Sequence, residues 1–363
     1  MRAAILIALA ALAAQAAAPP ATLKDAFKGA FVIGAAINTA QAAGQDADLI
    51  TAQFNSVTPE NDLKWEKIHP EPDRYNFAPA DQYVAYGEKH HMYIVGHCLV
   101  WHSQTPAWVF HDDKGNLLTR DALLARMRDH IRTVVGRYKG RIHDWDVVNE
   151  ALDEDGTLRK SLWLQIIGPD YIAKAFQFAH EADPAATLNY NDYSLENEAK
   201  RNGAVKLIRE LKDAGVPVSI VGIQGHDHMD WPSAGAEDAA IEAFGALGVK
   251  VAITEFDINV LPQAAPHTAE VSLSVEARKE LNPWPDALPA AQQEALAKRY
   301  AGLFAVFMKH RDVVARVTFW GVTDGGSWLN NWPVKGRTNY PLLFDRGGQP
   351  KPAFHAVVRT AVQ

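Results

Sequence analysis

The sequence predicts a single (β/α)8 barrel, the TIM-barrel form of the α/β class, in which eight parallel strands alternate with helices. Three observations support this prediction. Apolar, β-branched runs recur eight times, helical apolar periods lie between them, and polar side chains collect where the runs end. The 363 residues fit one barrel of this kind, and no linker or second apolar core divides the chain.

The predicted strands are short runs rich in Val, Ile and aromatic residues. They fall at residues 31–37, 54–58, 93–100, 142–148, 187–190, 218–223, 249–253 and 315–320. A strand whose two faces are both covered reads as a nearly continuous apolar run, which is typical of parallel sheets. The eight runs therefore favour a closed parallel barrel.

Helices are predicted between the strands from apolar residues at helical spacing. The clearest covers residues 120–138, and its apolar face consists of Leu123, Leu124, Met127, Ile131, Val134, Val135 and Tyr138. A second covers 197–211 with Gly215 beyond its end, and a last one at 352–362 is expected to close the barrel. The Ala- and Pro-rich segment 261–288 is expected at the carboxyl ends of the strands, where long insertions of such barrels lie.

Residues 1–18 have the pattern of a secretory signal peptide, because Arg2 is followed by a short apolar run and then by small residues. The run is too short for a membrane-spanning helix. We therefore expect the barrel to occupy residues 19–363, with no membrane span. The chain is expected to be exported, either to the periplasm or to the medium.

Composition narrows the class of partner. The net charge is −7 and no basic block occurs, which argues against nucleic acid, whose binding needs concentrated Lys and Arg. Ten Trp exceed what packing alone would require and indicate an aromatic-lined cleft. Cys98 is the sole cysteine, so no intrachain disulfide can form, and we expect it to be buried. We also expect a monomer.

Two strand-like runs end in carboxylates, Asp146 to Glu150 and Val251 to Asp257. One glutamate at a strand end is more often a solvated cap or an ion-pair partner. Two of them on different strands meet at the same rim of a barrel, where active sites are found. A pair of Asp or Glu side chains flanking a bond is the equipment needed to cleave a glycosidic linkage.

Several motifs, in order from about Leu23 to the C-terminus, resemble those of the family 10 glycoside hydrolases, the retaining endo-β-1,4-xylanases. They are Gly34-Ala35-Ala36, Pro59-Glu60-Asn61 with Lys64-Trp65, Gly96-His97 with Val100-Trp101-His102-Ser103-Gln104, Asp146 to Glu150, Gly222 to His226, Thr254 to Asp257, and Phe319 to Asp324. The resemblance implies that the chain hydrolyses internal bonds of xylan and xylooligosaccharides by double displacement, without a cofactor or metal.

The resemblance also implies roles for individual residues. Glu150 corresponds to the general acid/base and Glu255 to the nucleophile, with His226 and Asp257 orienting Glu255. We expect burial and repulsion from Glu255 to raise the pKa of Glu150. Asn149 corresponds to the residue that binds the sugar 2-hydroxyl, although a strand-end Asn can also cap a loop.

The expected substrate contacts follow from the same resemblance. On the glycone side they are Glu60, Asn61, Lys64, His97, Trp101 and Gln104, with Trp320 and Trp328 as aromatic walls and Gln224 as a further contact. Asn191 and Tyr193 fall on the leaving-group side, where structural support is an equal interpretation. Trp65 is expected in the core.

Three alternatives remain open. A zinc hydrolase would use ligands among His97, His102, His226 and His228. A non-catalytic carbohydrate-binding barrel would keep the cleft, and a cellulase or mannanase would share both glutamates. The segment 263–288 departs from plainer family members in length and composition, which leaves the reach of the subsites and the tolerance of xylan side chains open.

Overall fold

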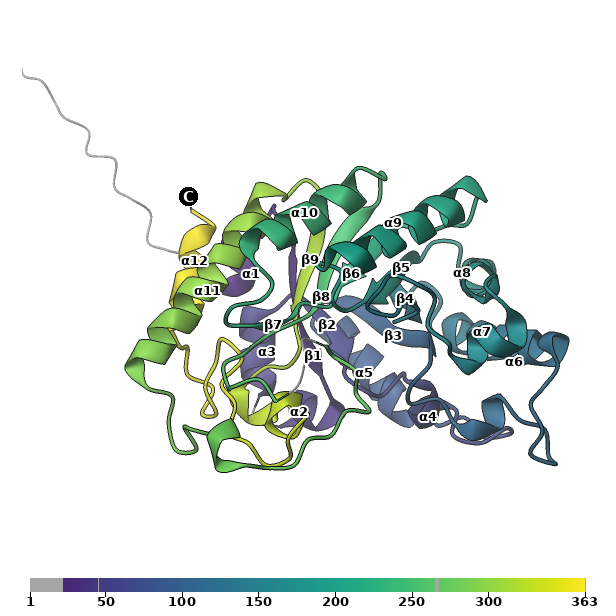
Figure 1. The fold of residues 1–363 in the computed structure, drawn as a ribbon, viewed down its shortest axis with the longest axis horizontal. Helices are drawn as coiled ribbons and strands as arrows, with labels where there is room; N and C mark the ends of the chain where they lie inside the picture. Colours follow the sequence, from purple (N-terminus) through teal and green to yellow (C-terminus); the bar gives the residue numbers. More distant parts are fainter. Residues whose placement is uncertain (1–21, 45, 265–267, 363) are drawn as a thin grey trace, which may run out of the picture.

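Eight parallel strands form a closed barrel in the computed structural model, which describes residues 22–44, 46–264 and 268–362 (Figure 1). Each strand pairs with its neighbour, and β6 pairs with β8, which closes the ring and confirms the predicted fold. The barrel strands are β1 (Val32–Ile37), β2 (Ser56–Pro59), β3 (Tyr93–Trp101), β4 (Asp144–Asn149), β5 (Thr187–Asp192), β6 (Ile220–Ile223), β8 (Lys250–Asn259) and β9 (Val314–Phe319).

The seventh barrel strand, β8, is longer than predicted. Its pairing with β6 ends at Ile253, and its last residues pair instead with the short additional strand β7 (His226–His228), with His226 opposite Asp257. The register against β9 is irregular between Ile253 and Phe256. Glu255 therefore lies inside β8, at this irregularity, and not at the end of the strand as its apolar run suggested.

Helices surround the strands (Figure 1). The three whose bounds were predicted begin and end within two residues of the expected positions: α6 (Arg120–Arg137), α9 (Glu198–Asp213) and α12 (Pro352–Thr360). The other helices are α1 (Leu23–Ala26), α2 (Thr39–Ala43), α3 (Ala47–Gln53), α4 (Trp65–Ile68), α5 (Ala78–Lys89), α7 (Leu162–Ile167), α8 (Tyr171–Ala182), α10 (Ala234–Gly245) and α11 (Ala290–Lys309). Within the described part of the chain, four 3-10 turns complete the elements: η1 (Ala107–Val109), η2 (Lys279–Leu281), η3 (Asp324–Gly326) and η4 (Trp328–Asn330).

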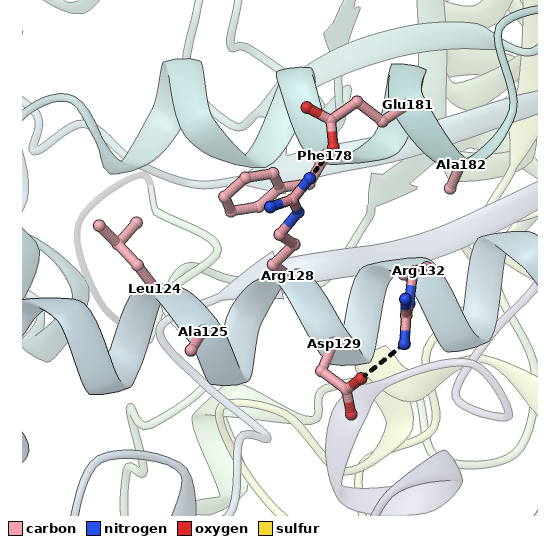
Figure 2. Close-up of a pocket in the computed structure, with 8 residues that line it drawn as sticks. All are labelled: Leu124, Ala125, Arg128, Asp129, Arg132, Phe178, Glu181 and Ala182. Carbon is pink, nitrogen blue, oxygen red and sulfur yellow. Dashed lines mark hydrogen bonds and ion pairs between the residues drawn. The ribbon is translucent and has the colours of Figure 1, made fainter.

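The helix α6 illustrates how sequence sets an element. Thr119 caps it by accepting a hydrogen bond from the Ala122 backbone N–H at 3.4 Å. All the predicted apolar positions of its inner face are buried except Leu124. Leu124 lines a surface groove between α6 and α8, where Arg128 forms an ion pair with Glu181 at 2.7 Å (Figure 2).

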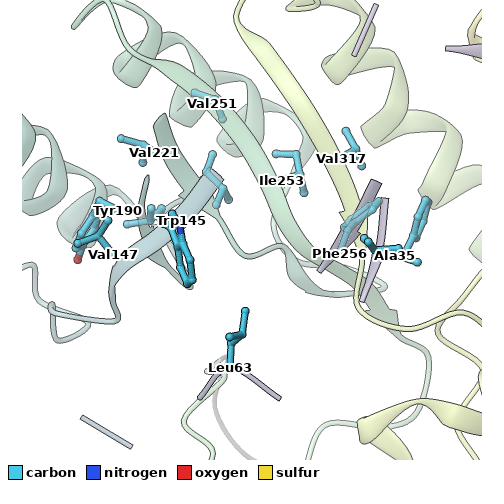
Figure 3. Packing of buried hydrophobic residues seen from close by; sticks show 14 of the residues in the cluster. Ala35, Leu63, Trp145, Val147, Tyr190, Val221, Val251, Ile253, Phe256 and Val317 are labelled. Atoms are coloured by element: carbon cyan, nitrogen blue, oxygen red, sulfur yellow. The ribbon is translucent and has the colours of Figure 1, made fainter. Parts of the chain in front are cut away.

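Large side chains of the strands, among them Trp145, Tyr190 and Phe256, belong to the buried hydrophobic cluster (Figure 3). Phe256 packs on Tyr300 and Phe307 of α11. Trp145 in β4 pairs with Gly96 in β3, and its indole occupies the space beside this glycine. Cys98 is buried, as predicted. Trp65 is also in the core, where it stacks on His130 with ring centroids 3.6 Å apart.

The predicted signal peptide, residues 1–18, lies outside the described residues. Among the helices of the described residues, none is both long and apolar enough to cross a bilayer.

The contact between Gly96 and Trp145 gives a testable prediction. Gly96→Ala should lower the free energy of unfolding by about 1–3 kcal/mol, because the added Cβ would overlap the indole ring of Trp145. The measurement is the urea midpoint, with Gly136→Ala in α6 as the control. A Cβ at position 136 meets no atom within 4 Å outside its own helix, so this change should leave the stability unchanged or raise it by up to about 1 kcal/mol. Equal midpoints for Gly96→Ala and the unmodified chain would contradict the packing described.

Candidate active site

A cavity at the carboxyl ends of the barrel strands contains most of the predicted site residues. The predicted site residues that do not line the cavity are Asn191, Tyr193 and Asp257. The lining residues are Glu60, Asn61, Lys64, His97, Trp101, Gln104, Asn149, Glu150, Gln224, His226, Glu255, Ala269, Val271, Trp320 and Trp328. Parallel strands bring residues far apart in sequence to one rim, which explains why the motifs converge.

Glu150 is fixed by both its backbone and its carboxyl group. It follows β4 with a φ of 56°, in the left-handed region, and its backbone N–H donates to the Asn191 carbonyl at 2.8 Å. The Trp101 indole N–H donates to Oε2 at 2.7 Å, and the Gln224 amide donates to Oε1 at 3.0 Å. Trp101, predicted as a sugar contact, therefore also holds this carboxyl in place.

The pKa of Glu150 is raised, mainly because the side chain is buried. The charge of His102 opposes this shift, and the nearby carboxylate of Asp192 adds to it. Burial was one of the two causes predicted. The neighbouring carboxylate that contributes is Asp192, whereas the sequence suggested Glu255.

Glu255 lies at the end of a hydrogen-bonded chain. His226 Nε2 lies 3.2 Å from Glu255 Oε2, and His226 Nδ1 lies 3.1 Å from Asp257 Oδ1. The Trp328 indole N–H donates to the other oxygen of Asp257 at 2.7 Å. The Asn191 amide donates to Glu255 Oε1 at 2.8 Å, so both oxygens of Glu255 have a partner.

The pKa of Glu255 is lowered, in contrast to that of Glu150. Burial acts to raise it, but the hydrogen bond from His226 and the nearby positive charges outweigh burial. Burial likewise acts to lower the pKa of His226, yet the charge of Asp257 and the hydrogen bonds to both carboxylates raise it to about 10. His226 is therefore an imidazolium at neutral pH and donates from both nitrogens.

The two asparagines differ in what they contact. The Asn191 amide donates to Asn149 Oδ1 at 2.8 Å as well as to Glu255, and its own oxygen accepts from the Thr254 hydroxyl at 2.6 Å. Asn191 is completely buried, so its side chain contacts protein groups. Asn149 lines the cavity, and its amide lies 3.3 Å from Glu150 Oε1.

A polar and aromatic cluster forms one side of the cavity. Lys64 Nζ donates to Asn61 Oδ1 at 3.1 Å and to Gln104 Oε1 at 3.0 Å. The same ammonium group lies 4.9 Å from the centroid of the Trp101 ring and 6.0 Å from that of Trp320. Charged and amide groups beside indole rings match a sugar, which has hydroxyl groups at its rim and an apolar C–H face.

His97 forms a hydrogen bond with Asp146, which was not among the predicted site residues. Its Nδ1 lies 2.8 Å from Asp146 Oδ2, and its ring meets Trp320 edge-on with centroids 5.3 Å apart. Asp146 is itself buried in β4. The signal was present in the sequence, since an Asp inside an apolar strand needs a partner.

Arg159 and the residues around Glu270 also contact the site, although sequence reasoning did not assign them to it. The Arg159 guanidinium donates to the Glu150 carbonyl at 3.0 Å and to the Tyr193 hydroxyl at 2.7 Å. It also donates to Glu270, from the long segment after β8. Ala269 and Val271 of the same segment line the cavity. This segment, whose role the sequence left open, is thus one wall of the site.

The histidines considered as zinc ligands differ in their surroundings. His97 and His226 are hydrogen-bonded to the carboxylates of Asp146 and Asp257. Within the described residues, three potential metal ligands come together at one place, on the outer helical layer, and these are Asp238, Glu242 and His310. Lys309 Nζ already pairs with Asp238 there at 2.7 Å.

The arrangement can supply an acid and a nucleophile from one pair of residues. Two buried carboxyl groups share a cavity, and their surroundings move their pKa values in opposite directions. Such a separation is how a site keeps one carboxyl protonated and the other ionised at the same pH.

Comparisons with known proteins agree with this geometry. Residues 22–360 match the model of Glycosyl hydrolase family 10. Endo-1,4-beta-xylanase A of Xylanibacter ruminicola is 47% identical over 342 residues, which is 93% of each chain. The endo-1,4-beta-xylanase of Geobacillus stearothermophilus is 43% identical over 93% of this chain and 98% of its own.

Solved structures are similar throughout. The structure of a GH10 endoxylanase from a sugarcane soil metagenome superimposes with a TM-score of 0.90 at 48% identity, over 93% of this chain and 99% of that one. Xylanase XynB from Paenibacillus barcinonensis, in complex with a conduramine derivative, superimposes with a TM-score of 0.86 at 39% identity, over 95% of this chain and 99% of that one. The resemblance inferred from the motifs is confirmed by both sequence and structure, and the chain belongs to glycosyl hydrolase family 10.

Proposed function

We propose that the chain is a retaining endo-1,4-β-xylanase that hydrolyses internal β-1,4-xylosidic bonds of xylan and xylooligosaccharides. One observation carries the mechanism: the pKa of buried Glu150 is raised while that of buried Glu255 is lowered. The curated relatives at 47% and 43% identity are named endo-1,4-beta-xylanases, which supports the substrate class.

In the first step Glu255 is the nucleophile. Its carboxylate attacks the anomeric carbon while the bond to the leaving oxygen breaks, and that oxygen takes the proton of Glu150. The imidazolium of His226 keeps Glu255 ionised and oriented. The product is a covalent glycosyl-enzyme, and Glu150 is left as a carboxylate.

In the second step Glu150 acts as a base. It removes a proton from water while the water oxygen attacks the anomeric carbon and Glu255 leaves. The indole N–H of Trp101 and the amide of Gln224 donate to the two oxygens of Glu150, which favours the carboxylate form that this step needs. Each step inverts the anomeric centre, so the overall reaction retains its configuration.

We also propose that the enzyme is exported and acts as a monomer. The support for export, to the periplasm or the medium, is the signal-like pattern of residues 1–18. The support for a monomer is the small exposed apolar surface, since within the described residues the exposed large hydrophobic side chains are Leu117 and Val362.

The preference for xylose over glucose gives the first prediction for this site. Trp320 and Trp328 line the cavity beside the catalytic pair and should crowd the hydroxymethyl group that glucose carries. Aryl β-xylotriosides should therefore be cleaved with kcat/KM at least about 10-fold higher than aryl β-cellotriosides, since even one methylene group at a tight wall is worth about 10–200-fold. Equal values for the two series would favour a cellulase-type specificity.

The stereochemistry gives a second prediction. The first sugar released from xylohexaose should have the β-configuration, because two displacements at one carbon restore the original geometry. Proton NMR within the first minutes, before mutarotation, would measure the anomeric signals. An initial α-anomer would rule out the double displacement.

A third prediction separates the two glutamates with azide. Glu150→Ala should lose activity on xylan but still form the glycosyl-enzyme from a dinitrophenyl xylobioside, whose leaving group needs no acid. Azide should then restore turnover of this substrate, and the product should be the β-glycosyl azide. Glu255→Ala has no group that can form the intermediate, so azide would attack directly and give the α-glycosyl azide. The α-azide from Glu150→Ala and the β-azide from Glu255→Ala would mean that the roles are reversed.

A further inference from the structure

The long segment between β8 and α11 approaches the site from the side of Glu150. Its residues Ala269 and Val271 face the cavity, and Glu270 stands between them. The Trp332 indole N–H donates to the Glu270 carbonyl at 3.2 Å, and the Val275 N–H donates to the Pro333 carbonyl at 2.8 Å. The backbone around Glu270 is thus attached to the loop that carries the aromatic wall.

The two oxygens of the Glu270 carboxylate have different partners. Oε1 accepts from the backbone N–H and the hydroxyl of Ser272, at 3.2 and 3.0 Å, which stabilises the turn of the segment itself. Oε2 lies 2.9 Å from Nη1 of Arg159 and 3.5 Å from Nε2 of His102. Oε1 therefore stabilises the segment itself, and Oε2 faces two side chains that lie beside Glu150.

Both of these side chains also contact Glu150. His102 Nδ1 lies 3.9 Å from Glu150 Oε2, and Arg159 Nε donates to the Glu150 carbonyl at 3.0 Å. Neither ring nitrogen of His102 has a closer hydrogen-bond partner among the described residues, although both are buried. The orientation of this ring therefore depends on the two carboxylates between which it lies.

The charge of Glu270 is maintained across the working range of pH. Its contact with His102 is the largest of the influences that lower its pKa, which falls to about 2. Partial burial opposes this, and the Ser272 backbone N–H assists it. Glu270 is consequently an anion whenever Glu150 is able to act as an acid.

From this geometry we propose that Glu270 is a positioning residue for the acid/base Glu150, acting through His102 and Arg159. It does not touch the reacting atoms. Its charge holds the His102 ring against the Glu150 carboxyl and the Arg159 guanidinium against the Glu150 backbone. The left-handed backbone of Glu150, with φ 56°, makes the second of these contacts important for where the carboxyl points. The inference rests on the proposed role of Glu150.

A positioning role has a specific kinetic signature. Glu150 matters for glycosylation in proportion to how much protonation the leaving group needs. Misplacing its carboxyl should therefore slow glycosylation by substrates with poor leaving groups and leave glycosylation by substrates with good leaving groups unchanged. A general loosening of the cavity would slow both kinds alike.

The test compares Glu270→Gln with the unmodified chain on aryl β-xylobiosides. Gln keeps the acceptor oxygen that serves Ser272 but removes the charge that faces Arg159 and His102. For phenyl xylobioside kcat/KM should fall about 10-fold, part of the about 10²–10⁴-fold that general acid catalysis supplies. For dinitrophenyl xylobioside it should stay within about twofold. A plot of log kcat/KM against leaving-group pKa should become steeper.

Two variants provide the controls. Ser272→Ala removes the hydroxyl contact to Oε1 and leaves the pairs of Oε2, so its plot should match that of the unmodified chain. Glu150→Ala should give the steepest plot. Three results would overturn the positioning role. Glu270→Gln could give the same plot as the unmodified chain, it could lower kcat/KM equally for both substrates, or Ser272→Ala could give the same plot as Glu270→Gln. A flat response of Glu150→Ala would instead overturn the proposed role of Glu150 itself.

Discussion

The site depends on one constraint: two carboxyl groups are removed from water in the same cavity, and only Glu255 has partners that outweigh its burial. Burial penalises the charge on both Glu150 and Glu255. For Glu150, burial outweighs the charge of His102 and the hydrogen bonds from a neutral indole and a neutral amide, so its pKa rises. Glu255 faces an imidazolium, so its pKa falls. The barrel supplies the rigid frame that keeps these two environments different within one small space.

Much of this could be predicted from the sequence, because strands buried on both faces leave a clear pattern. The eight apolar runs predicted the barrel strands, and the abrupt carboxylates after two of them predicted two glutamates that the structure places in one cavity. The pattern failed where pairing partners change. β8 leaves β6 after Ile253 and continues beside β7, so Glu255 lies within a strand whose polar end looked like a loop.

Other features were out of reach of this reasoning for physical reasons. Arg159 lies nine residues beyond Glu150, and Glu270 lies in a segment with neither apolar periodicity nor turn signals that fix its path. Their approach is set by tertiary contacts, such as the one between Trp332 and the Glu270 backbone. Motif matching also assigned Trp101 to the sugar alone, because a motif records which residue is present and does not record what its N–H meets.

Trp328 contacts both the cavity and the hydrogen-bonded chain of Glu255, which matters for attempts to alter specificity. Its ring is part of the cavity wall, while its N–H ends the chain that runs through Asp257 and His226 to Glu255. Residues that share a hydrogen-bond network usually show coupling energies of about 0.5–3 kcal/mol, so their effects do not add. A change at this wall would therefore alter recognition and reactivity together. Protein engineers would have to select for both properties at once and could not combine separately optimised substitutions.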